Sequence, residues 1–159
     1  MINYSSGLKW LWLTVLVFCL DLWTKNLASQ FLQMHEPVTV IPGFNLTLMH
    51  NYGAAFSFLG DAGGWQRWFF ICLTVVVSTF ILIWLYGLKA KQRWIACALA
   101  MILGGAIGNL WDRVTLGYVI DYIGFLFWPS FNIADVAITV GGLMLIYYLI
   151  KEDSKSSKK

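Results

Sequence analysis

The sequence predicts an all-α integral membrane protein with four transmembrane helices and a small extracytoplasmic β element. Of its 159 residues, 59% are hydrophobic and only 12% are charged, whereas about 25% of the residues in soluble domains are charged. Four stretches approach the roughly 20 apolar residues that a helix needs to cross a bilayer. The basic residues also gather in segments that a four-span topology places on the same side of the membrane.

The four spans account for most of the chain, so we expect one membrane-embedded domain over residues 1–159. The predicted spans are residues 8–28, 65–88, 94–110 and 133–150. Two outer loops, 29–64 and 111–132, connect them on one side. Residues 151–159 form a polar, lysine-rich tail that we expect to be flexible.

The basic residues predict how the chain is oriented. Eight of the 11 lie in the amino-terminal segment, the second connection and the tail: Lys9, Lys89, Lys91, Arg93, Lys151, Lys155, Lys158 and Lys159. The positive-inside rule makes these segments cytoplasmic, so both termini are expected in the cytoplasm and both longer loops outside. The net charge of +3 is small and scattered, which argues against nucleic acid as a partner. Membrane lipids are the expected surroundings.

The cysteines do not indicate a disulfide or a metal site, and the first span does not indicate a cleaved signal peptide. Cys19, Cys72 and Cys97 lie inside predicted spans at unrelated spacings, so we expect apolar packing residues and no disulfide, metal or cofactor. Asp21 and Lys25 interrupt the first apolar run, which is therefore read as an uncleaved anchor.

Both outer loops contain sequence that favours extended structure. "PVTVIPGFNLTLMHN" predicts two strands around a turn at Pro42 and Gly43, and the second strand alternates apolar and more polar residues. We expect this sheet to lie on the outer leaflet. Pro129 interrupts helical structure before the fourth span. This places Asp121 on a short strand or loop and Asp135 in the first turn of a helix.

Four aspartates lie inside or beside the spans, toward the outer side: Asp21, Asp112, Asp121 and Asp135. Charge at that depth costs several kcal/mol unless it has a partner or water, so each is a candidate for function. Asp21 and Lys25 have the spacing of an ion pair on one helix. That pair is either structural, reaching toward the interface, or it holds an active site together.

"GGAIGNLWDR" closes the third span. Its small residues permit close approach of another helix: Gly104, Gly105, Ala106 and Gly108. Asn109, Asp112 and Arg113 project from one face of the outer end. Asp112 and Arg113 either form an interfacial ion pair or belong to a site, whereas Asn109 resembles a site residue. In "NYGAAF", Asn51 and Gly53 return to the membrane surface as site residues or as a loop anchor.

Asp121 and Asp135 are the pair that we expect to perform chemistry. They come from separate elements that meet at the outer face. Two carboxylates facing each other in a poorly solvated place share one proton. One then activates water and the other protonates a carbonyl or a leaving amine, as in aspartic proteases. The alternative is that each caps a helix or binds a backbone amide.

Five motifs in order along the chain resemble the lipoprotein signal peptidase (signal peptidase II) family: "DLWTK", "NYGAAF", "GGAIGNLWDR", "GYVID" and "FNIAD". The resemblance implies an aspartic endopeptidase of the bacterial cytoplasmic (inner) membrane, with its active site toward the outer face. Its substrates would be diacylglyceryl-modified prolipoproteins, cleaved before the lipidated cysteine, and globomycin-type inhibitors would block it.

The resemblance also implies residue roles. Asp121 and Asp135 correspond to the catalytic pair. The other residues that match the motifs line the site or support it: Asn51, Gly53, Asn109, Arg113, Asn132, Asp112, Asp21 and Lys25.

Two rival functions make different demands on the same aspartates. A small proton- or cation-coupled transporter subunit would need its acidic residues near the bilayer midplane. A structural assembly factor, in which the aspartates only pair helices, would tolerate isosteric neutral substitutions.

Overall fold

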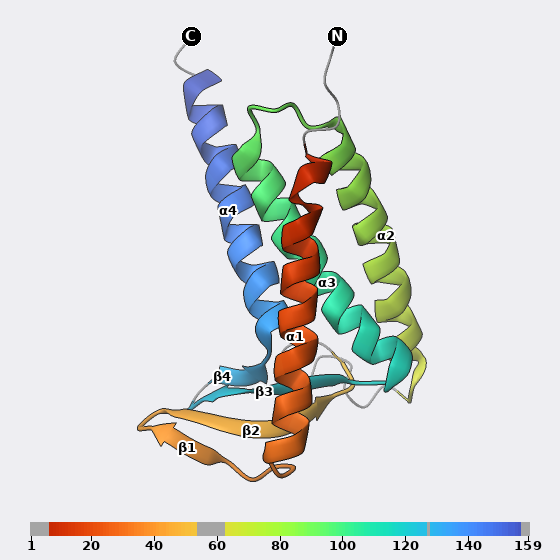
Figure 1. The fold of residues 1–159 in the computed structure, drawn as a ribbon, viewed down its shortest axis with the longest axis vertical. Coiled ribbons are helices and arrows are strands. Elements are labelled where there is room, and N and C mark those ends of the chain that lie inside the picture. The colour runs from red at the N-terminus through yellow and green to blue at the C-terminus, as the bar shows by residue number, and fades with distance from the viewer. Residues whose placement is uncertain (1–6, 54–62, 127, 157–159) are drawn as a thin grey trace.

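The protein is a bundle of four long helices with an antiparallel sheet at one end (Figure 1). The computed structural model describes residues 7–53, 63–126 and 128–156. Its elements are η1 (Leu8–Trp10), α1 (Leu11–Phe31), β1 (Val38–Ile41), β2 (Phe44–Asn51), α2 (Trp65–Gly87), α3 (Arg93–Thr115), β3 (Val119–Phe125), β4 (Trp128–Phe131) and α4 (Ile133–Ser156). Four helices within the described residues are long and apolar enough to cross a membrane. This confirms the predicted fold class.

Three helices extend beyond the expected spans. We expected the first span to end at Ala28, but α1 continues to Phe31. We expected the third span to end at Leu110, but α3 continues to Thr115, so Asp112 and Arg113 lie on a helix and not in a loop. We expected the fourth span to end at Ile150, but α4 continues to Ser156 through part of the expected tail. Residues 157–159 of that tail, and residues 54–56 of "NYGAAF", lie outside the described residues.

The sheet joins the two outer loops. Its strand order is β1-β2-β3-β4, and every neighbouring pair is antiparallel. The predicted turn between the first two strands is confirmed, with Gly43 at φ 89°, a conformation that favours glycine. β2 then pairs with β3, which places Met49 opposite Asp121. The hairpin was predicted, but this pairing of strands distant in sequence was not.

Small residues let α3 pack closely in the middle of the bundle. A Cβ atom added at Gly104 would lie 2.8 Å from the Cβ of Val17 on α1. A Cβ atom added at Gly105 would overlap the backbone oxygen of Ala134 on α4. These contacts confirm the expected role of the "GGAIG" segment, because α3 approaches α1 and α4 through different faces.

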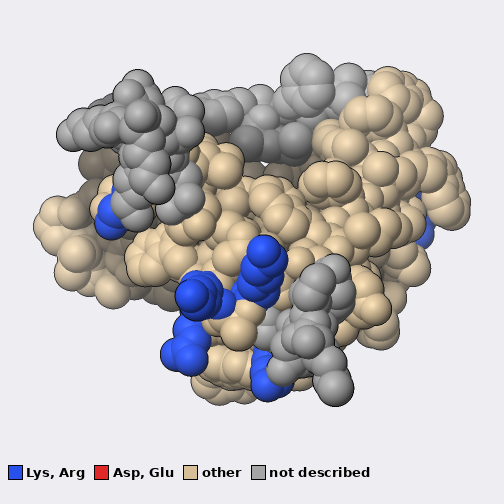
Figure 2. Space-filling model, turned by 90° about the horizontal axis from the view of Figure 1, so that it is seen from above, with Lys and Arg blue, Asp and Glu red and all other residues tan. Residues whose placement is uncertain are grey.

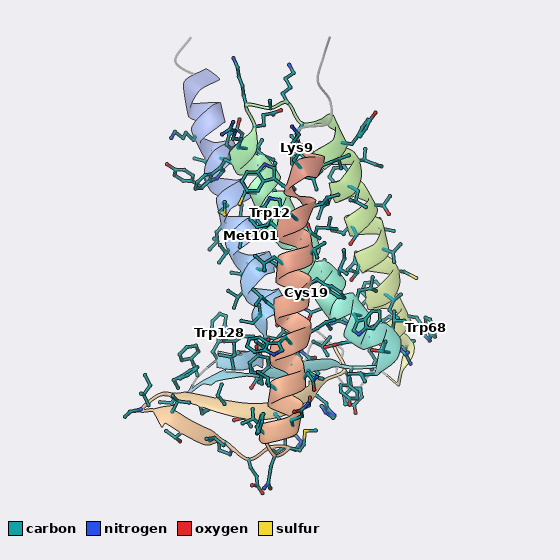
Figure 3. All side chains as sticks on the ribbon, in the orientation of Figure 1. Lys9, Trp12, Cys19, Trp68, Met101 and Trp128 are labelled. Carbon is teal, nitrogen blue, oxygen red and sulfur yellow. The ribbon has the colours of Figure 1, made fainter. Side chains whose placement is uncertain are left out.

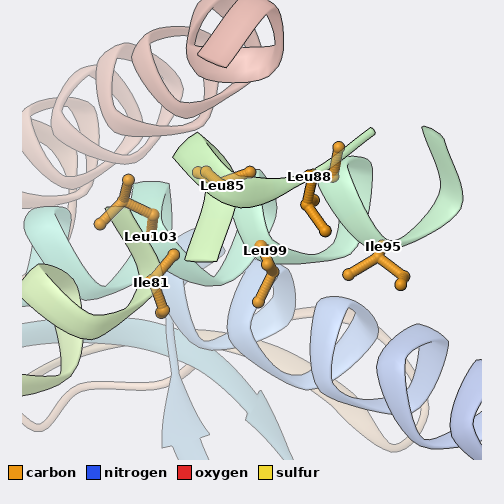
Figure 4. Close-up of a cluster of buried hydrophobic side chains, with 7 residues drawn as sticks. Ile81, Leu85, Leu88, Ile95, Leu99 and Leu103 are labelled. Atoms are coloured by element: carbon orange, nitrogen blue, oxygen red, sulfur yellow. The ribbon is translucent and has the colours of Figure 1, made fainter. Parts of the chain in front are cut away.

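Two apolar clusters hold the elements together. The larger lies mainly between α2 and α3 (Figure 4) and contains Ile81, Leu85, Leu88, Ile95, Ala96, Leu99 and Leu103. The smaller fastens the sheet to the end of α1 and contains Ala28, Leu48, Ile120 and Tyr122. The packing role expected for the cysteines is wrong for two of them, because Cys19 and Cys72 are exposed.

The two ends of the bundle differ in their side chains. The end that carries both termini, which we call the terminal end, displays Lys and Arg but no Asp or Glu among its described side chains (Figure 2). Exposed Lys9, Lys89, Lys91, Arg93 and Lys151 belong to the segments that meet there. At the opposite end, which we call the sheet end, Trp68 points away from α2 (Figure 3) and is 63% exposed.

Candidate active site

Asp121 lies in the middle of β3 and is buried. Its Oδ1 accepts a hydrogen bond from Asn132 Nδ2 at 2.7 Å, and its Oδ2 accepts one from Asn51 Nδ2 at 3.0 Å. Burial, and next the negative charge of Asp135, raise the pKa of the Asp121 carboxyl from 3.8 to about 7, although the two amide donors oppose this rise. Asp121 is therefore a carboxyl group that can hold a proton near neutral pH.

Asp135 lies in the first turn of α4, as predicted, and is fixed by a reciprocal cap. Its backbone N–H donates to Asn132 Oδ1 at 2.9 Å, while its own Oδ2 accepts from the Asn132 backbone N–H at 3.2 Å. This is the arrangement of a capping box, which satisfies two N–H groups that the helix leaves unpaired. Asp135 therefore does cap its helix, as the structural alternative for this residue expects.

Asn132 and Asn109 connect the two carboxylates. The Asn132 side chain bonds both Asp121 and the backbone of Asp135. Asn109, on α3, donates through Nδ2 to Asp135 Oδ1 at 2.8 Å. Its Oδ1 accepts from Lys25 Nζ at 3.0 Å and from Asn132 Nδ2 at 3.2 Å. Because both of these neighbours are donors, the amide of Asn109 can point only one way, with its N–H toward Asp135.

A buried ionic cluster lies behind the two carboxylates. Lys25 Nζ lies 2.7 Å from Asp21 Oδ2 and 2.9 Å from Asp112 Oδ2. All three side chains are at most 3% exposed. The predicted pair of Asp21 and Lys25 is confirmed, but the idea that it reaches out to the interface is wrong. The pairing of Asp112 with Arg113 is also wrong, because Asp112 turns inward to Lys25.

The carboxylates of this cluster also hold the backbone beside each candidate catalytic residue. Asp21 Oδ1 accepts from the N–H of Ala134 at 2.9 Å, directly before Asp135. Asp112 Oδ2 accepts from the N–H of Ile120 at 3.1 Å, directly before Asp121. Lys25 thus joins two carboxylates that fasten α4 and β3 in place.

Arg113 projects from α3 toward the turn that follows β2. Its guanidinium donates to the Gly53 carbonyl at 2.9 Å and lies 4.9 Å from the centre of the Phe70 ring. The Gly53 N–H in turn donates to Asn51 Oδ1 at 3.0 Å. The first residues of "NYGAAF" are therefore part of the site as well as an anchored turn.

A cavity of about 450 Å³ opens beside these residues. Its polar wall consists of residues identified in the sequence: Asn51, Asn109, Arg113, Asp121 and Asp135. The remaining wall comes from β3, β4 and one side of α4: Val119, Trp128, Pro129, Ser130, Phe131, Val136, Ile138, Thr139 and Val140. The place of β4 in the wall of the site was not predicted, because nothing in residues 128–131 alone indicates what the strand faces.

Comparison with known proteins shows the family of this chain. The family described as "Signal peptidase (SPase) II" matches residues 13–151 of the chain. The chain belongs to the signal peptidase II family. This confirms both the expected family and the expected class of enzyme, an aspartic peptidase.

Several members of the signal peptidase II family are close to this chain in sequence. It is 48% identical over 159 residues to a lipoprotein signal peptidase of Alteromonas mediterranea, covering 98% of this chain and 87% of that one. It is 50% identical over 161 residues to one from Acinetobacter baumannii, with coverage of 97% and 92%. For one from Pseudomonas aeruginosa the identity is 51% over 150 residues, with coverage of 91% and 89%.

A solved structure has the same fold. It is a bacterial membrane enzyme determined by the in meso method at 2.3 Å resolution. The TM-score is 0.86 at 28% identity, and the match covers 95% of this chain and 93% of that one. The fold of this signal peptidase is therefore that of a bacterial membrane protein.

Proposed function

We propose that this member of the signal peptidase II family removes signal peptides from diacylglyceryl-modified prolipoproteins, using Asp121 and Asp135 as its catalytic pair within one membrane-embedded domain. The observation that carries the proposal is that both carboxylates bond Asn132 and line the same cavity. The relatives named lipoprotein signal peptidase support the substrate class.

The two carboxylates take different parts in the reaction. Asp121, whose pKa is raised to about 7 by burial and by Asp135, supplies the proton. Asp135 is the base that takes a proton from water as the water oxygen attacks the scissile carbonyl carbon, while Asp121 gives its proton to the carbonyl oxygen. The tetrahedral intermediate then collapses and the C–N bond breaks. The proton held by Asp135 passes to the leaving amine, and one hydroxyl proton of the intermediate returns to Asp121 as the carbonyl group forms again.

The remaining polar residues orient the reacting groups. Asn132 and Asn109 hold the two carboxylates, while Asn51 and Arg113 present N–H groups along the cavity wall. Fixed donors of this kind stabilise the negative charge that develops on the carbonyl oxygen. They also suit an extended peptide, whose backbone carbonyls need partners when they leave water.

The apolar wall of the cavity suits a substrate that carries acyl chains. Trp128, Val136 and Val140 are exposed on β4 and α4 beside the polar wall. A lipidated cysteine reaches such a site by lateral diffusion, with its acyl chains still among the membrane lipids. Peptides of the globomycin type are expected to compete for the same cavity.

We place the terminal end of the bundle in the cytoplasm and the active site toward the outer face of the bacterial cytoplasmic membrane. The exposed basic residues of the terminal end support this orientation through the positive-inside rule. The candidate catalytic residues lie at the sheet end, away from the bilayer midplane. A proton or cation pathway would need carboxylates at mid-membrane depth, so no observation favours a transporter.

The test is cleavage of a purified diacylglyceryl-modified prolipoprotein by the wild-type protein, with the product masses measured. We expect a new amino terminus at the lipidated cysteine. The same prolipoprotein without its lipid is the matched substrate control, and we expect it to be cleaved far more slowly. Absence of cleavage of the lipidated substrate, or a cut at another bond, would overturn the proposal.

A further inference from the structure

Arg67, in the first turn of α2, caps the end of α3. Its Nε donates to the carbonyl oxygen of Arg113 at 2.7 Å, and its Nη2 donates to the carbonyl oxygen of Val114 at 2.9 Å. Carbonyl groups in the last turn of a helix have no partner within that helix. The planar guanidinium, with its fixed fork of donors, satisfies two of them at once. After α3 the chain turns at Gly117, whose φ is 91°. A Cβ atom added at Gly117 would lie 3.5 Å from the Arg67 guanidinium.

Arg113, whose backbone carbonyl accepts from Arg67, also has partners for its side chain. The Arg113 guanidinium lies 4.9 Å from the centre of the Phe70 ring, which is on the same helix as Arg67. It also donates to the carbonyl oxygen of Gly53 at 2.9 Å. The first two turns of α2 therefore contact Arg113 twice, at its backbone through Arg67 and at its side chain through Phe70.

These contacts continue to Asp121. The Gly53 N–H donates to Asn51 Oδ1 at 3.0 Å, which leaves the Asn51 amide nitrogen to donate to Asp121 Oδ2 at 3.0 Å. The amide cannot turn over without losing both bonds. A displacement of Arg113 would thus reach Asp121 through Gly53 and Asn51.

We propose that Arg67 is a positioning residue for peptide cleavage, which fixes Arg113 so that the Gly53 turn aims the Asn51 amide at Asp121. This inference rests on the proposed function. The simpler reading is that Arg67 only caps α3 and stabilises the fold. The two readings differ in what happens when the Arg113 side chain is removed, because the backbone carbonyls that Arg67 caps remain.

The experiment is a double-mutant cycle that measures kcat/KM on the lipidated prolipoprotein with Arg67→Gln, Arg113→Gln and the double variant. We expect Arg67→Gln to lower kcat/KM about tenfold in the wild-type background but less than about twofold in the Arg113→Gln background. Residues in contact commonly show coupling of this size. An equal factor in both backgrounds, or no effect of Arg67→Gln alone, would overturn the inference. Arg93→Gln, at the other end of α3, is the matched control and should leave activity unchanged.

A second readout uses the single variant alone. If Arg67→Gln releases Asn51 from Asp121, the alkaline limb of the pH profile moves to higher pH, because a donor that favoured ionised Asp121 is lost. Asp135 on α4, Lys25 on α1 and Arg113 on α3 also act on the charge of Asp121. A displaced Arg113 cation would move the limb in the same direction. A cap with a purely structural role would lower activity equally at every pH and leave the limb in place.

Arg67→Lys keeps the charge but not the fork of donors, and it replaces Arg67→Gln in both experiments if the neutral variant fails to fold. The outcomes are separate from those of the proposed function. If wild type does not cleave the prolipoprotein, the function is wrong. If wild type cleaves and the Arg67 effect is independent of Arg113, only this inference is wrong.

Discussion

Lys25 and Asp112 form a buried ion pair at 2.9 Å that joins α1 to α3. Asp112 also accepts the N–H of Ile120, so this one pair links the membrane bundle to the strand that carries Asp121. The same ammonium lies 2.7 Å from Asp21, which holds the start of α4. A single cation is thus shared by two carboxylates that each fasten one half of the candidate active site.

Replacing Lys25 by methionine should destabilise the protein strongly. Met is similar in length but leaves Asp21 and Asp112 as uncompensated buried charges, and breaking a buried pair in this way costs about 3–5 kcal/mol. Thermal unfolding in detergent measures the effect. Lys89→Met, at an exposed lysine, should lie within about 0.5 kcal/mol of wild type. A Lys25→Met protein with the melting temperature of wild type would show that the ionic cluster contributes little to the free energy of unfolding.

Asn109→Leu should lower the activity of the folded protein, and it should also lower its stability because Lys25 and Asn132 each lose an acceptor. The variant removes the N–H that bonds Asp135 at 2.8 Å, and loss of one well-placed active-site donor commonly lowers kcat by about 100-fold or more. Asn26→Leu, at an exposed asparagine of α1, is the matched control. If both variants cleave prolipoprotein at the wild-type rate, Asn109 does not orient Asp135.

The pH dependence of cleavage should follow the proton on Asp121. Burial and the charge of Asp135 raise the pKa of this carboxyl to about 7, so the proton is present below that value and lost as the pH rises through it. We therefore expect kcat/KM to fall as the pH rises, with the midpoint of the fall at about pH 7. Asn51→Leu removes a donor that lowers this pKa, and should move the midpoint to higher pH. A midpoint that stays fixed or moves downward contradicts the assignment of the proton.

The spans were predictable because the membrane imposes a local requirement on the sequence. Apolar length alone located all four helices, and the position of Asp135 after Pro129 was enough to place it in a first turn. The end of α3 was not predictable in the same way. Its last turn contains Asp112 and Arg113, which interrupt the apolar run, and the turn is stabilised by partners on other elements, among them Lys25 and Arg67.

The parts of the site that depend on the pairing of strands distant in sequence could not be predicted either. The two outer loops become one sheet because β2 pairs with β3, and no local pattern specifies which strand a hairpin adds next. The ionisable candidate residues were recognisable because a charged side chain inside a membrane is costly. Asn132, which is uncharged, was identified only through the resemblance to the family. That Asp112 is a second partner of Lys25, and not of Arg113, follows only from the fold.

Two adjacent glycines on α4 provide a test of the helix packing. A Cβ atom added at Gly141 would lie 2.7 Å from the backbone oxygen of Ala98 on α3, whereas one added at Gly142 meets nothing within 4 Å. Gly141→Ala should therefore destabilise the protein by about 1–3 kcal/mol, as overpacking does. Gly142→Ala should be neutral or slightly stabilising. Equal melting temperatures for the two variants would contradict the close approach of α3 and α4.

The central claim is that Asp121 and Asp135 perform the hydrolysis, and the most direct measurement compares cleavage of lipidated prolipoprotein by wild type, Asp121→Asn and Asp135→Asn. Asparagine keeps the size of each side chain but can neither give nor take the required proton. We predict that both variants remain folded and lose activity by a factor of about 1000 or more, as enzymes do when a catalytic group is removed. Wild-type cleavage by either folded variant would show that its aspartate is structural and that the mechanism is wrong.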